Sequence, residues 1–166
     1  MKNNLLIVCQ SEKLGNKICA VLSEKTGFMV LNIEDYIQYE LYNKQEMENL
    51  FGTDYYKEKE LNLIQKLEDF ENCIISVSPK IFLNENYTNI FKNLANTIFI
   101  KTTQNYLENE ASQEMDAQIQ KSLLVRNITI EEIDLLLEKY CSKTILYPLN
   151  VFVNEEINQL TTDLLK

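Results

Sequence analysis

Apolar residues recur along this chain in two patterns that predict different secondary structures. Short apolar runs separated by polar segments are typical of buried strands. Such runs lie at residues 5–9, 28–32, 73–78, 97–101 and 144–148. Between them, apolar residues return at every third or fourth position, which is typical of helices with one buried face. The predicted helices lie at residues 16–26, 34–43, 55–70, 84–95, 129–140 and from about 154 to the C-terminus.

This alternation of strands and helices predicts an α/β protein that forms a single domain over residues 1–166. We expect a five-stranded parallel sheet with helices on both faces, which gives three layers, α/β/α. Ligands of such folds bind beyond the carboxyl ends of the strands. The segments that follow predicted strands are therefore the places to search for a site: residues 9–17, 32–35, 76–80 and 101–103.

Composition narrows the classes of partner. The chain has a formal net charge of −9, which argues against a protein that binds nucleic acid or a membrane surface. No apolar run is long enough for a signal peptide or a membrane span. The four cysteines form no CxxC pair and the chain has no histidine, so no zinc site is expected. We predict a cytoplasmic protein whose cysteines are reduced and structural.

The order of elements and several local segments resemble the shikimate kinases, small P-loop kinases of the nucleoside-monophosphate-kinase type. In that family a strand leads into a loop of the form GxxGxGK[ST]T, followed by a helix, a glycine and a strand that ends in DxD. Here "CQSEKLGNK" stands at the loop, Gly27 at the glycine, and Asn32 and Glu34 at the two acidic positions. The resemblance implies the strand order 2-3-1-4-5 and an ATP- and Mg²⁺-dependent activity.

The resemblance also extends to later segments, each with an altered residue. Lys57 in "YKEKE" takes the place of a substrate-binding arginine, and Ser78 in "VSP" lies where a glycine-rich turn contacts the substrate. Lys121 in "KSLL" replaces an arginine of the lid, and Arg126, the sole arginine, follows it. Residues 103–128 are thus expected to form the lid. A lysine keeps the charge of an arginine but loses its two-pronged grip on an anion.

The loop segment lacks the residues by which a P-loop holds phosphate. Without gaps, Gly15 stands at the position of the phosphate-binding lysine, and Glu12 and Leu14 stand at inner glycines. A carboxylate about 4 Å from a phosphate charge costs roughly 4 kcal/mol at an effective dielectric constant of about 20. Asn16 and Asn32 occupy the expected Mg²⁺ positions, so no metal is predicted. The remaining candidates for a phosphate-loop remnant are Ser11, Lys13, Gly15, Asn16 and Lys17.

We interpret the sequence as that of a shikimate-kinase-like protein that has lost phosphoryl transfer and acts in binding or regulation. No cofactor is then expected, and the partner is an unknown protein or a small anionic metabolite. A first alternative is a divergent kinase that needs ATP and Mg²⁺, in which Lys13 or Lys17 serves the phosphates. Glu34 would then be the catalytic base for the hydroxyl group of shikimate or a similar acceptor. A second alternative is a structural or oligomeric subunit whose cleft is filled by side chains such as Leu14 and Phe82.

Tyrosines gather in one part of the chain. Tyr36, Tyr39 and Tyr42 recur at every third position of a predicted helix, and Tyr55 and Tyr56 open the next one. The sequence leaves two interpretations open for this group. Either the rings pack in the core with their hydroxyl groups at the surface, or they form an aromatic surface for a partner beside the substrate cleft.

Overall fold

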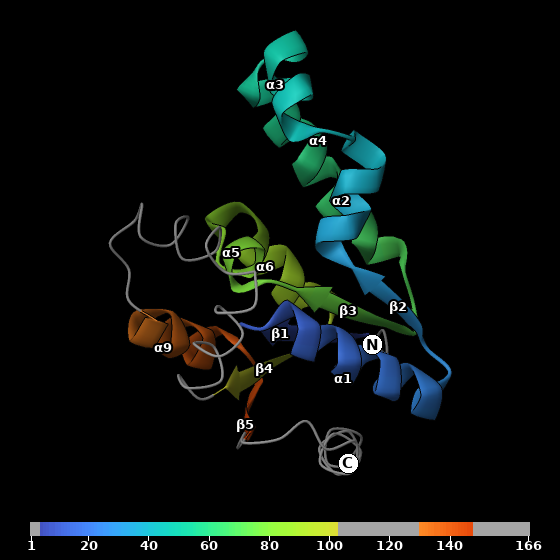
Figure 1. Cartoon of the computed structure of the whole chain (residues 1–166), viewed down its shortest axis with the longest axis vertical. Helices are drawn as coiled ribbons and strands as arrows, with labels where there is room; N and C mark the ends of the chain where they lie inside the picture. The colour runs from blue at the N-terminus through green and yellow to red at the C-terminus, as the bar shows by residue number, and fades with distance from the viewer. Residues whose placement is uncertain (1–3, 103–129, 148–166) are drawn as a thin grey trace.

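A computed structural model describes residues 4–102 and 130–147 (Figure 1). The strands are β1 (Leu5–Cys9), β2 (Met29–Asn32), β3 (Cys73–Val77), β4 (Asn96–Thr102) and β5 (Lys143–Tyr147). The helices are α1 (Glu12–Thr26), α2 (Ile33–Leu41), α3 (Lys44–Phe51), α4 (Thr53–Lys66), α5 (Pro79–Phe82), α6 (Glu85–Leu94) and α9 (Ile130–Tyr140). A short 3₁₀ turn, η1 (Leu67–Asp69), follows α4.

The strands form one parallel sheet in the order β2-β3-β1-β4-β5, which confirms the predicted fold class and strand order. Alternate side chains of each strand point to opposite faces, so the sheet divides the core in two. On one face, Ile7, Ile74 and Ile100 pack against Leu14, Ile18 and Leu22 of α1. On the other face, Leu6, Val8 and Phe99 pack against apolar residues of α2, α4, α5, α6 and α9. The layers are therefore α/β/α.

Several element ends differ from the prediction by a few residues, and α4 ends at Lys66, where the 3₁₀ turn η1 takes up the rest of the helix predicted at 55–70. Three helices differ more. Helix α1 begins at Glu12 instead of residue 16, so the prediction of a loop over residues 12–15 is wrong. Helix α3 and the four-residue helix α5 were not predicted. The predicted lid at residues 103–128, the start of the helix at Thr129 and the helix from about residue 154 lie outside the described residues.

Helices α2, α3 and α4 form an arm that projects beyond the sheet (Figure 1). The inner parts of α2 and α4 reach the core through Ile33, Ile37 and Ile64. Helix α3, at the tip, has no buried residue. It is held by local signals, because the side chain of Asn43 caps its N-terminus and Gly52, with a φ of 90°, ends it. The arm tip is therefore folded but contributes little to the core.

The four cysteines are free thiols, and Cys9, Cys19 and Cys73 are buried. Burial raises the pKa of the Cys19 thiol to about 12, and a hydrogen bond with the Ser76 side chain acts in the opposite direction. Such a thiol is a packing residue rather than a nucleophile. Among the helices of the described residues, none is long and apolar enough to cross a membrane.

Candidate functional site at the carboxyl edge of the sheet

The turn between β1 and α1 is short and closed by its own hydrogen bonds. Strand β1 ends at Cys9 and α1 begins at Glu12, so only Gln10 and Ser11 connect them. Ser11 is the N-cap of α1, and its Oγ accepts a hydrogen bond of 3.1 Å from the main-chain N–H of Leu14. The main-chain oxygen of Ser11 accepts a second bond, of 2.9 Å, from the N–H of Gly15. These N–H groups therefore serve the helix start.

The next residues of the first turn pack into the core. Leu14 is fully buried in the apolar cluster beneath α1. Gly15 is buried too, and a Cβ atom there would lie 3.3 Å from Cys9 Cβ and 3.6 Å from Ser76 Oγ. Gly15 thus permits the close approach of α1 to β1 and β3. Its role in this structure is helix–sheet packing.

Asn16 and Asn32, which the resemblance places at the Mg²⁺ positions, are joined directly. Asn32 Nδ2 donates a hydrogen bond of 3.3 Å to Asn16 Oδ1. Asn32 also caps α2, since its Oδ1 accepts a bond of 3.1 Å from the N–H of Asp35. Both amide oxygens, the atoms that would ligate a metal, already accept hydrogen bonds. Two neutral amides in this state do not fit Mg²⁺, which is usually bound through carboxylates.

The search for a second metal site covers residues 4–102 and 130–147. Within these ranges, no three side chains of Cys, Asp or Glu gather in a way that would hold an ion.

Glu34, the candidate catalytic base, spans two segments of the carboxyl edge. It lies in the first turn of α2, and its Oε1 accepts a hydrogen bond of 2.9 Å from the main-chain N–H of Ser78. Ser78 is the N-cap of α5, which follows β3. The structure thus brings together two predicted cleft residues, Glu34 and Ser78. One carboxylate oxygen is held in place, as a positioned base or a structural brace would require.

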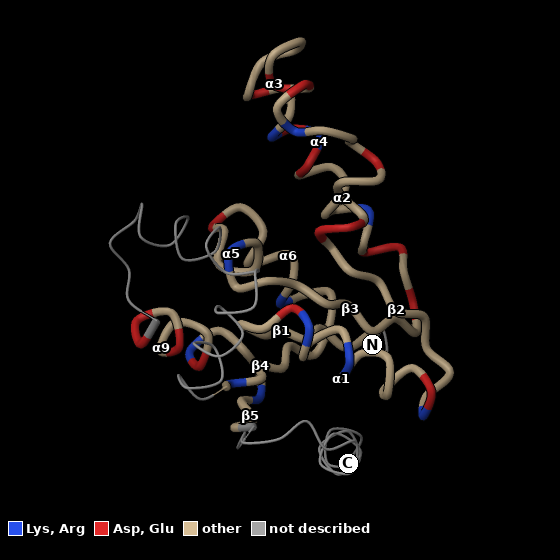
Figure 2. The backbone as a smooth tube through the Cα atoms, in the orientation of Figure 1, with Lys and Arg blue, Asp and Glu red and all other residues tan. Residues whose placement is uncertain are grey.

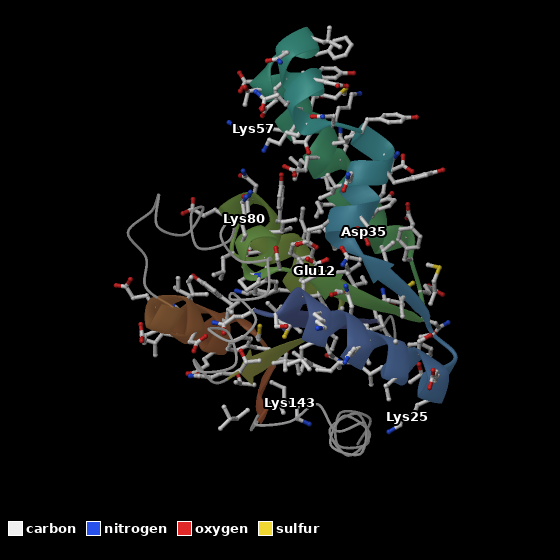
Figure 3. The ribbon with its side chains drawn as sticks, viewed as in Figure 1. Glu12, Lys25, Asp35, Lys57, Lys80 and Lys143 are labelled. Carbon is white, nitrogen blue, oxygen red and sulfur yellow. The ribbon has the colours of Figure 1, made fainter. Side chains whose placement is uncertain are left out.

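The predicted cationic residues are spread over the molecule. Lys13 and Lys17 are exposed residues of α1, and Lys57 is an exposed residue of α4. Figure 3 places Lys57 on the side of the arm where Lys80 of α5 also lies. Lys80 was not among the predicted site residues, although it follows the same strand as Ser78. The predicted lid residues Lys121 and Arg126 lie outside the described residues.

A polar network that sequence reasoning missed joins the ends of β1 and β4 to α9. Gln10 Nε2 donates a hydrogen bond of 2.5 Å to Asp134 Oδ1, and Gln10 Oε1 accepts one of 3.4 Å from Thr102. Lys101 Nζ lies 3.4 Å from Asp134 and 2.8 Å from Glu138. The i, i+4 spacing of the two acids was the available signal, but it does not identify Gln10, which is 124 residues from Asp134.

Asp134 is the buried carboxylate of this network. Burial raises the pKa of the Asp134 carboxyl, while the Lys101 ammonium and the Gln10 amide act to lower it. The hydrogen bond to Glu138 raises the pKa of Lys101. The network therefore holds α9 against the carboxyl edge, beside the β1–α1 turn.

We compared the chain with protein-family models, with solved structures and with curated proteins. The family model for shikimate kinase matches residues 16–146, a span that begins after the β1–α1 turn. Among solved structures, shikimate kinase from Bacteroides thetaiotaomicron has a TM-score of 0.70 at 12% identity, covering 99% of this chain and 97% of that chain. Shikimate kinase from Aquifex aeolicus has a TM-score of 0.66 at 16% identity, covering 98% and 94%. Shikimate kinase from Acinetobacter baumannii, solved with shikimate, has a TM-score of 0.70 at 12% identity, covering 99% and 92%. A search of curated proteins gave no match.

Proposed function

Since the chain belongs to the shikimate kinase family, we propose that it is a member that binds a partner or a small anionic ligand and no longer transfers a phosphoryl group. The start of α1 at Glu12 carries this proposal. A P-loop needs an open turn whose successive N–H groups face the phosphates. Here the corresponding residues form a capped helical turn.

Two features of that turn oppose a nucleotide. The N–H groups of Leu14 and Gly15 donate to Ser11, so neither is available to a phosphate oxygen. Replacing these bonds would require the first turn of α1 to unwind and fully buried Leu14 to leave the core. Glu12 would also bring negative charge to the same place, which repels a phosphate.

The proposal extends to the metal. Kinases of this kind hold Mg²⁺ between the protein and the phosphates. Asn16 and Asn32 bond to one another instead, and the Asn32 oxygen caps α2. The residues at these positions therefore stabilise the junction of α1 and α2 without an ion.

One observation favours the kinase alternative. Glu34 Oε1 is oriented by the Ser78 N–H, which leaves the second carboxylate oxygen to accept a proton from a substrate hydroxyl group. In that alternative ATP and Mg²⁺ are the cofactors, Lys13 or Lys17 contacts the phosphates, and the acceptor is shikimate or a similar alcohol.

Calorimetric titration of the purified protein with ATP and with ADP, each with Mg²⁺, separates the two functions. We expect no binding heat up to millimolar nucleotide. A micromolar dissociation constant, about −8 kcal/mol, would contradict the proposal. A coupled assay with shikimate would then follow, comparing the native protein with Glu34→Gln and Lys17→Ala. Loss of turnover in both variants would establish the divergent kinase.

A further inference from the structure

Large apolar side chains are exposed along the arm formed by α2, α3 and α4. The exposed fractions are 79% for Tyr39, 79% for Tyr42, 74% for Leu50, 58% for Phe51 and 38% for Tyr55. We call these five residues the arm patch. The rings of Phe51 and Tyr55 lie in contact, with centroids 5.1 Å apart. Neighbouring Tyr56 is buried and Tyr36 packs edge-on against Phe70, so the five tyrosines predicted as one group divide between core and surface.

The exposed apolar area of the arm patch is large for a surface that binds no partner. Aromatic side chains have on the order of 150–250 Å² each, so the exposed parts of the patch sum to roughly 600 Å². Contiguous apolar patches on monomers seldom exceed about 300–600 Å². One side of a stable protein interface buries about 800 Å², polar rim included. The arm patch thus approaches the apolar area that one side of an interface requires.

The backbone conformation of Tyr42 is a second observation that indicates a functional role for the arm patch. Its φ of 56° and ψ of −139° lie in a region that side-chain-bearing residues avoid. Glycine would relieve this strain, and the exposed Tyr42 ring gains little from core packing in return. A contact outside the chain would account for a tyrosine at this position.

The residues around the arm patch are mainly acidic, which favours a positively charged partner. Residues 39–59 contain the whole patch and the lysine that lies over Tyr55. They include five acids, Glu40, Glu46, Glu48, Asp54 and Glu58, and three lysines, Lys44, Lys57 and Lys59. Figure 2 shows acidic residues along this part of the arm. Lys44 is already engaged, 4.0 Å from Glu48 and 5.0 Å from the ring centroid of Tyr56. The last turns of α2 and α3 contain no basic residue, so their negative helix ends are not compensated.

Aromatic rings beside carboxylates favour cations with an apolar stem. A guanidinium or ammonium group gains energy over the face of a tyrosine or phenylalanine ring. The chain itself gives an example, since Lys59 Nζ lies 5.1 Å from the ring centroid of Tyr55. The patch offers several such rings with acids among them, and the apolar stems of arginine and lysine can cover the rings.

We propose that the arm patch docks a basic polypeptide segment in which arginine or lysine alternates with apolar side chains. The inference rests on the proposed binding function and names its partner class. A second copy of this chain is disfavoured, because two copies would bring the same acidic residues face to face. Because the patch residues are separate from the β1–α1 turn in sequence, a positive nucleotide titration would overturn the proposed function and leave this docking surface to be judged by its own test.

The test uses the full chain and an amphipathic peptide built only from leucine and arginine. Binding is followed by fluorescence anisotropy and mapped by amide chemical shifts. A second peptide replaces every arginine by citrulline, which keeps the shape and removes the charge. The patch variant carries Tyr42→Ser and Phe51→Ser. Its matched control carries Leu135→Ser and Leu146→Ser, which alter leucines that are 65% and 60% exposed on α9 and β5.

A second pair of variants tests the acids. Glu40→Gln with Glu46→Gln removes charge beside the patch, and Glu24→Gln with Glu71→Gln removes equal charge from exposed positions elsewhere. We expect the arginine peptide to bind about tenfold more weakly to the patch variant and to the first charge variant. Both controls should bind as the native protein does. The citrulline peptide should also bind about tenfold more weakly, and the shifted amides should lie in residues 33–66.

Several results would overturn the inference. One is the absence of binding by the arginine peptide, and another is equal binding by the patch variant and the native protein, which would indicate charge attraction alone. Equal binding of the citrulline peptide would indicate unspecific apolar adhesion. Light scattering that shows a dimer of the native protein and a monomer of the patch variant would identify a second copy as the occupant.

Discussion

Leu14, in the first turn of α1, is fully buried, whereas Leu50, near the end of α3, leaves most of its side chain in solvent. The same contrast holds for the segments around them. Ser11, Leu14 and Gly15 each have a packing or capping role in the fold, while α3 buries no residue. Residue identities at the β1–α1 turn are thus explained by folding. The exposed apolar residues at the arm tip, Leu50 and Phe51, are not explained in this way, so we seek their function in a contact outside the chain.

The largest expected effect comes from restoring a lysine at the position of the phosphate-binding lysine. Gly15→Lys places a Cβ 3.3 Å from Cys9 Cβ and a charged side chain between α1 and the sheet. We expect the free energy of unfolding to fall by roughly 3 kcal/mol or more. Urea denaturation followed by circular dichroism measures this change.

Asn16→Lys is the matched control, one residue further along the helix. Asn16 is exposed, and the variant loses only its surface hydrogen bond to Asn32. Its free energy of unfolding should change by less than about 1 kcal/mol. A Gly15→Lys protein that is as stable as the native one and binds ATP would show that this segment can open into a loop, which would remove the contrast.

The pair Leu14→Ala and Leu50→Ala measures the contrast directly. Truncation of a fully buried leucine leaves a cavity, so Leu14→Ala should lower the free energy of unfolding by about 2–5 kcal/mol. Leu50→Ala should change it by no more than about 0.5 kcal/mol, because Leu50 is exposed. Equal losses in thermal or urea unfolding would mean that α3 packs against something in solution.

Local patterns predicted the strands, whereas the start of α1 was missed although its local signals were present. Buried parallel strands are nearly continuous apolar runs, and "LLIVC" coincides with β1 (Leu5–Cys9). At α1 the local signals were present, since a serine N-cap followed by Glu12 is typical of a helix start. The family alignment, which assigns a loop to these residues, obscured them.

Local sequence patterns do not predict the contacts between segments that are far apart in the chain. The period of three predicted Tyr36, Tyr39 and Tyr42 on one helix, but α2 ends at Leu41 and Tyr42 is its non-helical C-cap. Tyr36 packs against Phe70 while the other two rings stay in solvent, and no local pattern distinguishes them. The bond between Gln10 and Asp134 depends on how α9 lies against β1 and β4. Neither residue carries a sequence signal for that partner.

The N-cap residues of α1 and α3 extend the comparison of the two regions, with smaller expected changes in the free energy of unfolding. Ser11→Ala leaves the buried N–H of Leu14 without its 3.1 Å acceptor, so a loss near 2 kcal/mol is expected. Asn43→Ala removes exposed bonds to the N–H groups of Gln45 and Glu46, which water can replace. The expected loss there is about 0.5–1 kcal/mol. Larger damage from Asn43→Ala than from Ser11→Ala in urea unfolding would contradict the assignment of the turn to the core.

The smallest effect concerns pH and the network beside the turn. The folded-state pKa of Asp134 is raised, mainly by burial, so the folded protein retains a proton at pH values where the unfolded chain has lost it. Asp134 therefore favours the folded state at low pH. Its contribution is lost as the pH rises from the unfolded pKa through the folded pKa.

Asp134→Asn removes this titration and keeps an oxygen that accepts from Gln10 or Lys101. The difference in unfolding free energy between variant and native protein should thus shift in favour of the variant as the pH increases across that window. Above it, the loss of the ion pair with Lys101, at 3.4 Å, adds a constant term. Glu138, which also pairs with Lys101 at 2.8 Å, is present in both proteins. A difference that favours the native protein increasingly as pH rises would mean that pairing with Lys101 outweighs burial, and that the network holds α9 by charge.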